Sequence, residues 1–315
     1  MNLLPLWLAP LHGITNFHFR NCLYRHVEGF DVAVTPFLPV GSVTQLNVRR
    51  WRDVAPENNT ACETIPQLIG NNPPHFVDTI QELQKLGYNR FNWNIGCPAA
   101  QVVRKQRGCG IMPHPAWVED VVKMVMEETD CRFSVKMRLG LRSPDEGIEI
   151  VERLNRYPLD FIAVHPRLGV QQYEGNPDFA AFQKIYELSV NPLIYSGDIF
   201  DIPSYQRLLA QFPKVSGVML GRGVLRNPFL AEELRAGMAL PEKVRQHRFR
   251  AFYSDYVDML RQIRGEQGSL SVLKELWHYF AHFFGLSEPE LHSLLRLTDY
   301  SEFCGRAAEI TGDRE

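Results

Sequence analysis

The segment Thr64–Gly70 (TIPQLIG) is a short apolar run, followed by His75–Leu86 (HFVDTIQELQKL) and by a second apolar run at Arg90–Asn94 (RFNWN). Both runs have the length of a strand, whereas apolar residues in the segment between them recur with helical spacing. An apolar strand, a helix and another apolar strand predict two parallel neighbouring strands whose connection covers one face of the sheet.

The same alternation extends over the first 220 residues. Eight short apolar runs have the composition of buried strands: Leu6–Pro10, Asp31–Thr35, Thr64–Gly70, Arg90–Asn94, Arg132–Arg138, Asp160–Val164, Pro192–Ser196 and Ser216–Leu220. Helical periodicity separates most of them, as in Trp117–Glu128. Eight such units in about 225 residues predict an α/β fold of the (β/α)8 TIM-barrel type. A doubly wound open sheet is the main alternative.

The pattern changes after Leu220. We expect a helix over Asn227–Gly237 and then only helices, at Val244–Ile263, Leu270–Phe284 and Glu288–Leu295. This predicts a catalytic barrel domain over residues 1–238 and a small helical bundle over residues 239–315.

Composition limits the classes of function. The chain has 34 basic and 36 acidic residues, a net charge of −2, so bulk charge gives no support for nucleic-acid binding. Its six cysteines are irregularly spaced and include no C-x-x-C motif, which favours a reducing cytoplasm over a disulfide framework. No apolar run approaches the ~18 residues of a spanning helix. The apolar start contains Pro5 and Pro10 and lacks a basic leader, so we interpret it as a strand rather than a signal peptide.

Residues that could take part in catalysis or ligand binding follow the predicted strands at their carboxyl ends, where barrel active sites are built. They are Pro10, Gln67, Asn94–Pro98, Lys136, Arg138, His165–Arg167, Ser196–Asp198 and Gly221–Gly223. Gly197 and Gly221 would let backbone N–H groups approach a phosphate, Arg222 could hold it as a fork, and a helix beginning near Asn227 would add its dipole. The alternative is that these glycines only make tight turns.

Cys97 lies between a glycine and a proline just after a strand. A thiol in this position can serve as an acid, a nucleophile or a metal ligand, although an inert buried cysteine is the alternative. A zinc site with Cys109 and His114 lacks a convincing fourth ligand, so we expect no metal. Gly108–Gly110, around Cys109, is interpreted as a flexible loop.

Three further features have a structural and a functional interpretation. Lys136 in an apolar strand needs either an anionic ligand or an acidic barrel partner. His165 could serve as a base or cofactor contact, or as a core histidine. The basic segments Arg104–Arg107 and Arg49–Arg52 could contact a polyanion or form solvated faces.

Taken together and in order, these motifs resemble one family. Leu8–Arg20 (LAPLHGITNFHFR) resembles the opening signature of the tRNA-dihydrouridine synthases, and Asn94–Pro98 followed by Gly108–Gly110 resembles their catalytic segment. The resemblance continues through Ser134–Arg138, Val164–Arg167, Ser196–Asp198, Leu220–Gly223 and Leu273–Phe280. It therefore covers nearly the whole chain.

The resemblance implies an FMN-dependent enzyme that reduces specific uridines in tRNA to 5,6-dihydrouridine. Hydride would pass from reduced FMN to C6 of uracil, Cys97 would protonate C5, and NADPH would re-reduce the flavin. It implies FMN contacts at Pro10, Leu11, His12, Gln67, Lys136, His165, Ser196, Gly197, Asp198, Gly221 and Arg222. Asn94 and Arg167 would hold the uracil, Arg104 and Lys105 would face the tRNA, and residues 239–315 would recognise its body. We expect a cytoplasmic monomer with no membrane contact.

Three positions depart from the family pattern. Ser196 replaces an asparagine, Asn92 replaces an aspartate, and Pro36 stands where an acidic residue is common. Two other functions remain open: an FMN-dependent barrel reductase acting on a small molecule, such as a free pyrimidine or an enone, and an RNA-binding protein without turnover. The helical tail and the basic loop after Cys97 favour the tRNA enzyme over the first, and the intact set of Cys97, Lys136 and Arg222 argues against the second.

Overall fold

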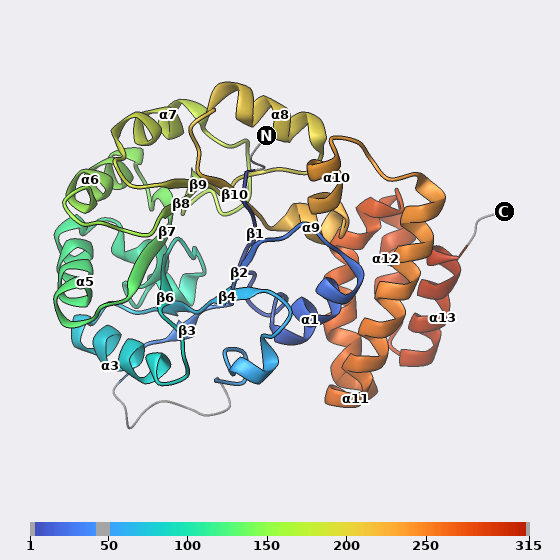
Figure 1. The fold of residues 1–315 in the computed structure, drawn as a ribbon. Helices are drawn as coiled ribbons and strands as arrows, with labels where there is room; N and C mark the ends of the chain where they lie inside the picture. The colour runs from blue at the N-terminus through green and yellow to red at the C-terminus, as the bar shows by residue number, and fades with distance from the viewer. Residues whose placement is uncertain (1–3, 42–50, 313–315) are drawn as a thin grey trace. The chain divides into compact units, whose positions relative to one another are not determined.

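The computed structural model describes residues 4–41 and 51–312. Its strands form one parallel sheet (Figure 1). Their bounds are β1 Leu6–Leu8, β2 Val32–Val34, β3 Leu38–Pro39, β4 Glu63–Ile65, β5 Gln67–Ile69, β6 Arg90–Ile95, β7 Arg132–Gly140, β8 Ile162–Leu168, β9 Leu193–Tyr195 and β10 Gly217–Leu220. Every one of the eight predicted strand segments overlaps at least one of them.

The ten strand segments form a closed barrel of eight strands, because two of these strands are each divided into two segments. The strand order is β3-β5-β6-β7-β8-β9-β10-β1-β2-β4. The two ends of this order are β3 and β4. Along the chain, β3 is the continuation of β2, and β5 is the continuation of β4 after Pro66. Since β2 pairs with β4 and β3 pairs with β5, the two ends of the order belong to the same pair of strands. The TIM-barrel prediction is confirmed.

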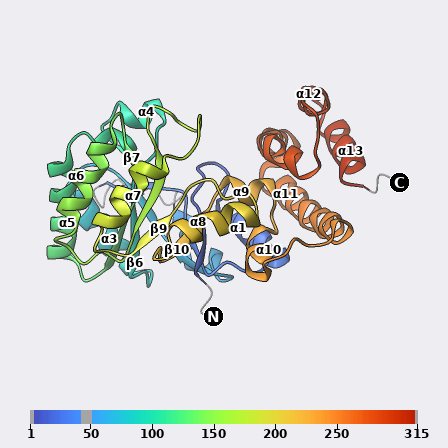
Figure 2. The same cartoon turned by 90° about the horizontal axis from the view of Figure 1, so that it is seen from above.

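Short strands and capped helices alternate around this barrel (Figure 1). Its helices are α3 Pro73–Gln84, α4 Ala100–Val103, α5 Pro115–Glu128, α6 Pro144–Leu154, α7 Phe179–Leu188 and α8 Ile202–Gln211, with 3-10 turns η2 Pro56–Asn58 and η3 Gly108–Ile111. Asn72, Ser143 and Asp178 cap α3, α6 and α7 through their side-chain oxygens. Figure 2 shows the helices α3, α5, α6 and α7 beside the strands in a second view.

Apolar side chains from several strands fill the barrel. The largest are Trp7 and Phe161, whose ring centroids lie 4.7 Å apart. They form one buried cluster with Ala9, Val32, Val34, Ile65, Ala163, Ile194 and Met219.

The remaining helices are α1 Phe17–His26, α9 Arg222–Arg226, α10 Leu230–Ala236, α11 Glu242–Phe283, α12 Glu288–Arg296 and α13 Tyr300–Thr311. The long helix α11 is interrupted at Gly265, where φ is 68° and ψ is 178°, so two helices follow each other as the sequence predicted. The expected helix at Asn227–Gly237 is shorter and ends at Gly237 in the left-handed region. The helix after β10 begins at Arg222, so the expected helix start near Asn227 was wrong.

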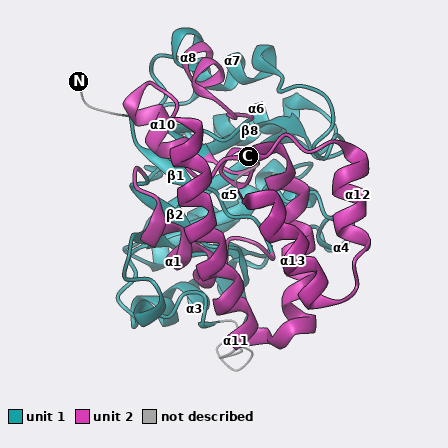
Figure 3. Ribbon diagram, turned by 90° about the vertical axis from the view of Figure 1, so that its right-hand side faces the viewer, with its two compact units in different colours: residues 1–12, 30–197, 208–219 teal, residues 13–29, 198–207, 220–315 magenta. Residues whose placement is uncertain are grey.

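Two compact units share the chain (Figure 3). Unit 1 comprises residues 1–12, 30–197 and 208–219, and unit 2 comprises residues 13–29, 198–207 and 220–315. Unit 2 thus combines α1 with the C-terminal helices, and its buried aromatic residues include Phe249, Phe252 and Trp277. The expected boundary near residue 239 lies between α10 and α11, and a separate recognition domain over 239–315 stays a prediction. No helix in the described ranges combines the length and apolar character needed to cross a membrane.

Candidate active site

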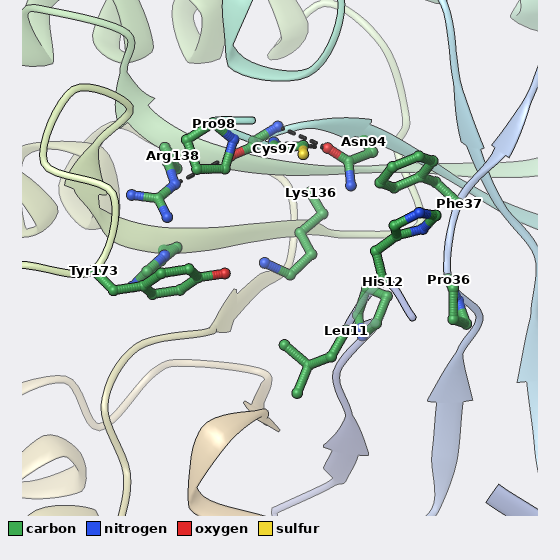
Figure 4. Close-up of a pocket in the computed structure, with 13 residues that line it drawn as sticks. Leu11, His12, Pro36, Phe37, Asn94, Cys97, Pro98, Lys136, Arg138 and Tyr173 are labelled. Carbon is green, nitrogen blue, oxygen red and sulfur yellow. Dashed lines mark hydrogen bonds between the residues drawn. The ribbon is translucent and has the colours of Figure 1, made fainter. Parts of the chain in front are cut away.

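A cavity in unit 1 collects residues from five different strand ends (Figure 4). The cavity has a volume of about 110 Å³. Its lining consists of Pro10, Leu11, His12, Pro36, Phe37, Asn94, Gly96, Cys97, Pro98, Lys136, Arg138, His165 and Tyr173. Seven of the residues predicted for the site therefore share one cavity: Pro10, Leu11, His12, Asn94, Cys97, Lys136 and His165.

Asn94 fixes the backbone of the Cys97 turn. Its Oδ1 accepts hydrogen bonds from the N–H groups of Gly96 at 3.1 Å and of Cys97 at 2.9 Å. Its Nδ2 donates to Gln67 Oε1 at 2.8 Å. The amide is therefore oriented unambiguously, and the second Nδ2 hydrogen is a donor available to a ligand because Asn94 lines the cavity.

A buried hydrogen-bond relay continues from Asn94 into the barrel. Gln67 Nε2 donates to Asn92 Oδ1 at 2.8 Å, and Asn92 Nδ2 donates to Ser134 Oγ at 2.9 Å. The Ser134 hydroxyl donates to the carbonyl of Phe91 at 2.8 Å. We call Asn94, Gln67, Asn92 and Ser134 the amide relay. All its bonds run in one direction, so each amide supports the orientation of the next.

The segment around Cys109 is a buried 3-10 turn, so the prediction of a flexible loop was wrong. The N–H of Cys109 donates to the carbonyl of Cys97 at 3.0 Å. Gly108 adopts a φ of +55°, and a Cβ there would lie 2.5 Å from that carbonyl oxygen. Close packing against the Cys97 turn, which only glycine permits, gives this segment its order.

The Cys97 thiol is half-buried and lies near two cations. Burial raises its pKa above the usual value, and the positive charges of Arg138 and Lys136 offset part of this effect. The thiol therefore keeps its proton at neutral pH, as a general acid must. Burial raises the pKa of Cys109 to about 12, and Cys109 does not line the cavity.

Lys136 stands beside Asn94 in the β6–β7 register. Burial, with a further contribution from Arg138, lowers its pKa to about 8. No acidic side chain of the described residues pairs with its ammonium group, and none lines the cavity. The alternative of an acidic barrel partner is therefore not realised, and Lys136 is available to an anionic or electron-rich ligand.

Arg138 connects the Cys97 turn to the loop after β8. Its Nε donates to the carbonyl of Gly96 at 3.0 Å, and its Nη1 donates to the carbonyl of Leu168 at 2.9 Å and to that of Gln172. Its guanidinium carbon lies 5.2 Å from the ring centroid of Tyr173. Figure 4 shows Tyr173 and Lys136 pointing toward each other across the cavity.

His165 and Arg167 lie within β8 rather than after it. Arg167 Nη1 lies 3.1 Å from His165 Nε2, so an arginine hydrogen bond there makes Nε2 the acceptor and places the ring proton on Nδ1. Arg167 also donates to the carbonyls of Glu174 and Gly175. It is 2% exposed and does not line the cavity, so its predicted contact with substrate stays a prediction.

An apolar wall faces these polar groups. His12 stacks on Phe37 with a centroid distance of 4.5 Å and an interplanar angle of 4°. Pro10, Leu11 and Pro36 extend this wall. The cavity therefore has a flat apolar side and a side that presents hydrogen-bond donors, an arrangement suited to a planar ring with carbonyl groups.

Several predicted site residues lie outside this cavity. Gln67 is fully buried behind Asn94. Arg104 and Lys105 are exposed at the end of α4. Ser196 and Gly197 follow β9 in unit 1, while Asp198, Gly221 and Arg222 belong to unit 2, where Arg222 pairs with Asp198. Arg49 and Arg50 lie outside the described residues. The roles of all of these stay predictions.

Two lining residues were missed from the sequence. Phe37 lies between β2 and β3, and Tyr173 lies in the loop after β8. Phe37 follows the carboxyl end of a predicted strand. It could have been found if the search for site residues had extended a few residues beyond each strand end. Tyr173 carries no such signal because the loop returns to the cavity through long-range contacts with Arg138 and Arg167.

Comparisons with known proteins identify the family of the chain. Residues 7–292 match the family model described as dihydrouridine synthase. The chain is 29% identical to a tRNA-dihydrouridine(16) synthase of Ralstonia nicotianae, with 95% of this chain and 94% of the relative covered. It is 25% identical to a probable tRNA-dihydrouridine synthase of Rhodobacter capsulatus, with 94% and 91% covered.

Solved structures resemble the fold at low identity. A morphinone reductase in complex with tetrahydroNAD matches with a TM-score of 0.52 at 12% identity, over 75% of this chain and 87% of that one. A structure named TcOYE, with pHBA, matches with a TM-score of 0.54 at 11% identity, over 80% and 94%. These likenesses support the barrel fold.

Proposed function

The chain belongs to the dihydrouridine synthase family, and on that premise we propose that it reduces particular uridines in tRNA to 5,6-dihydrouridine. One observation carries the proposal beyond family membership. The protonated thiol of Cys97 and the unpaired ammonium of Lys136 line the same cavity, which contains no carboxylate among its described lining residues. Such a cavity can donate a proton while favouring an electron-rich ring.

We infer that FMN is the cofactor and NADPH its reductant. The donor set fits a flavin because a flat apolar wall faces Lys136, which offers hydrogens to ring carbonyls and to negative charge. When bound, FMN would supply hydride chemistry to C6 of uracil. Its proposed contacts are Pro10, Leu11, His12, Gln67, Lys136, His165, Ser196, Gly197, Asp198, Gly221 and Arg222. Gln67 would act through Asn94, because it is fully buried behind that residue.

Cys97 is the proposed general acid. Its Sγ–H would deliver a proton to C5 of uracil, and the raised pKa keeps that proton in place at neutral pH. The amide relay and Gly108 would hold the turn that carries the thiol. These residues position the acid, and Cys97 alone among them would exchange a proton with substrate.

Uracil and tRNA would meet different parts of the chain. Asn94 would donate to a uracil carbonyl, and Arg167 would support the loop that approaches the base. Arg104 and Lys105 would contact phosphates, and residues 239–315 would recognise the tRNA body. Extruding the base costs a few kcal/mol, which remote contacts with tRNA can offset. We propose a cytoplasmic monomer without membrane contact.

A small-molecule FMN reductase is the second candidate. The solved structures of similar fold favour it only at the level of the barrel. Basic residues at the end of α4 and the helices of unit 2 favour tRNA, because a small molecule would not need them.

Dihydrouridine mapping in tRNA tests the proposal. A strain lacking the gene should lose dihydrouridine at one or more positions, and the wild-type gene should restore it. Cys97→Ala should bind FMN but leave those uridines unreduced, while Cys62→Ala, a half-buried cysteine outside the cavity, should restore them. Restoration by Cys97→Ala would remove the thiol from the reaction, and an unchanged tRNA in the deletion strain would favour a small-molecule substrate.

A further inference from the structure

Arg226 of unit 2 carries a guanidinium group without a hydrogen-bond acceptor among the described residues. It is the last residue of α9, four positions after Arg222. Its Nε is shielded from solvent and makes no hydrogen bond. Its Cζ lies 4.3 Å from the ring centroid of Phe200. Since a guanidinium has five N–H donors and buried donors are costly to leave unmade, the position lacks an acceptor.

The surrounding charges leave an excess of positive charge. Asp198, the carboxylate that acts on Arg226, is ion-paired with Arg222. Arg222 Cζ lies 5.8 Å from the same Phe200 ring, so two arginines flank one phenylalanine and share one carboxylate. Burial and the charge of Arg226 lower the pKa of His282 of α11, so this ring is mostly neutral at pH 7 and the positive charge comes from the two arginines.

Arg248, also in unit 2, is an arginine with a structural role and can be compared with Arg226. Its Cζ lies 4.7 Å from the ring centroid of Phe229, much like Arg226 over Phe200. However, Arg248 donates to both carboxylate oxygens of Glu232 at 2.7 Å and to the carbonyl of His26 at 2.6 Å. Packing on a phenylalanine is therefore compatible with full pairing, and the missing acceptor at Arg226 points to a ligand.

We propose that Arg226, supported by Arg222, binds a phosphate group. An arginine fork matches two oxygens of a phosphate, and a second arginine beside it adds charge that Asp198 only partly compensates. The phosphate belongs either to the cofactor or to the RNA backbone, and this choice rests on the proposed function. The sequence motif Gly221–Gly223 had pointed to Arg222 alone.

Ligand affinities separate the two sources. FMN and riboflavin titrations, followed by flavin fluorescence, compare wild type with Arg226→Gln, Arg226→Lys and the matched control Arg248→Gln. If the phosphate is that of FMN, Arg226→Gln weakens FMN binding about ten- to a hundredfold and leaves riboflavin binding unchanged. Arg226→Lys keeps the charge but not the fork, so it recovers part of the loss.

If the phosphate is that of RNA, FMN binding is unchanged and tRNA affinity falls in Arg226→Gln. The slope of log affinity against log salt then decreases by about one phosphate contact. Arg248→Gln should leave the flavin affinities as in wild type.

Inorganic phosphate tests the site independently of the proposed function. Phosphate should raise the Tm of the wild-type protein above that in chloride of equal ionic strength, and Arg226→Gln should lose most of this rise while Arg248→Gln keeps it. Unchanged phosphate, FMN and tRNA responses in Arg226→Gln would overturn the inference, as would equal losses of FMN and riboflavin binding. A wild-type protein that responds to phosphate but binds neither FMN nor tRNA would contradict the proposed function and leave this site standing.

Discussion

The backbone N–H of Cys109 donates to the carbonyl of Cys97 at 3.0 Å, so the buried turn at Gly108–Ile111 supports the turn that carries the thiol. Gly108 makes this approach possible because its missing side chain leaves room for the Cys97 carbonyl. A change at Gly108 should therefore alter the chemistry at Cys97 as well as the stability of the fold.

Gly108→Ala should reduce dihydrouridine formation strongly and lower the free energy of unfolding by about 1–3 kcal/mol, from strain at positive φ and overpacking. Gly87→Ala is the matched control, because Gly87 also has a positive φ, of +92°, but nothing lies within 4 Å of its would-be Cβ. It should show only the strain cost and keep its activity. Urea unfolding and tRNA analysis check both variants, and equal activities would contradict the proposed packing role.

Removing Lys136 should shift the reactivity of Cys97 to higher pH. The Lys136 charge lowers the pKa of the thiol, against the larger effect of burial, so Lys136→Met should raise that pKa further. Alkylation of Cys97 by iodoacetamide, followed by mass spectrometry across a pH series, measures the shift. A profile that stays in place or moves to lower pH would show that the lysine does not act on the thiol.

Lys136→Met should also stabilise the protein near pH 7 while weakening FMN binding. Folding lowers the lysine pKa from 10.5 to about 8, so the unfolded chain binds more protons between these values and stability rises with pH across that window. Replacing the buried charge should raise the free energy of unfolding by about 1–3 kcal/mol at neutral pH and flatten this rise. Lys123→Met, on the exposed face of α5, should change stability by less than about 0.5 kcal/mol. Denaturant titrations at several pH values check the sign.

The amide relay should tolerate an acid at position 92 but not an apolar side chain. Asn92→Asp keeps an acceptor for Gln67 Nε2, and the Ser134 hydroxyl can turn to donate to the second carboxylate oxygen. Asn92→Leu leaves the Gln67 amide unsatisfied, at a cost of about 1–3 kcal/mol, and releases the support of Asn94. We expect activity close to wild type in the first variant and a clear loss in the second at equal FMN content.

Thermal unfolding and dihydrouridine analysis of the two Asn92 variants test the relay. Full activity in Asn92→Leu would show that Asn94 needs no support from within the barrel.

The barrel could be predicted because its signals are local. Apolar runs such as Arg132–Arg138 predict buried parallel strands. Because the strands are parallel, the residues that follow them lie at the same end of the barrel. This is why Asn94, Cys97 and Lys136 were found to line one cavity. The breaks in the second and third strands were not predicted, because they depend on pairing between segments more than 25 residues apart.

The partners of individual side chains could not be predicted from the sequence either. Arg222, which the sequence predicts as a ligand contact, also pairs with Asp198, and Arg226 makes no hydrogen bond through its buried Nε. Tyr173 reaches the cavity from the loop after β8, where its ring lies 5.2 Å from the guanidinium carbon of Arg138. These contacts depend on which side chains are neighbours in the folded structure, and the spacing of residues along the sequence does not determine that.

The loop after β8 is anchored through its main chain. Arg138 donates to the carbonyls of Leu168 and Gln172, and Arg167 donates to those of Glu174 and Gly175. Every amino acid carries a carbonyl, so these particular hydrogen bonds do not themselves select the side chains of the loop. A substitution at Tyr173 can therefore change the lining of the cavity while these backbone hydrogen bonds keep the path of the loop.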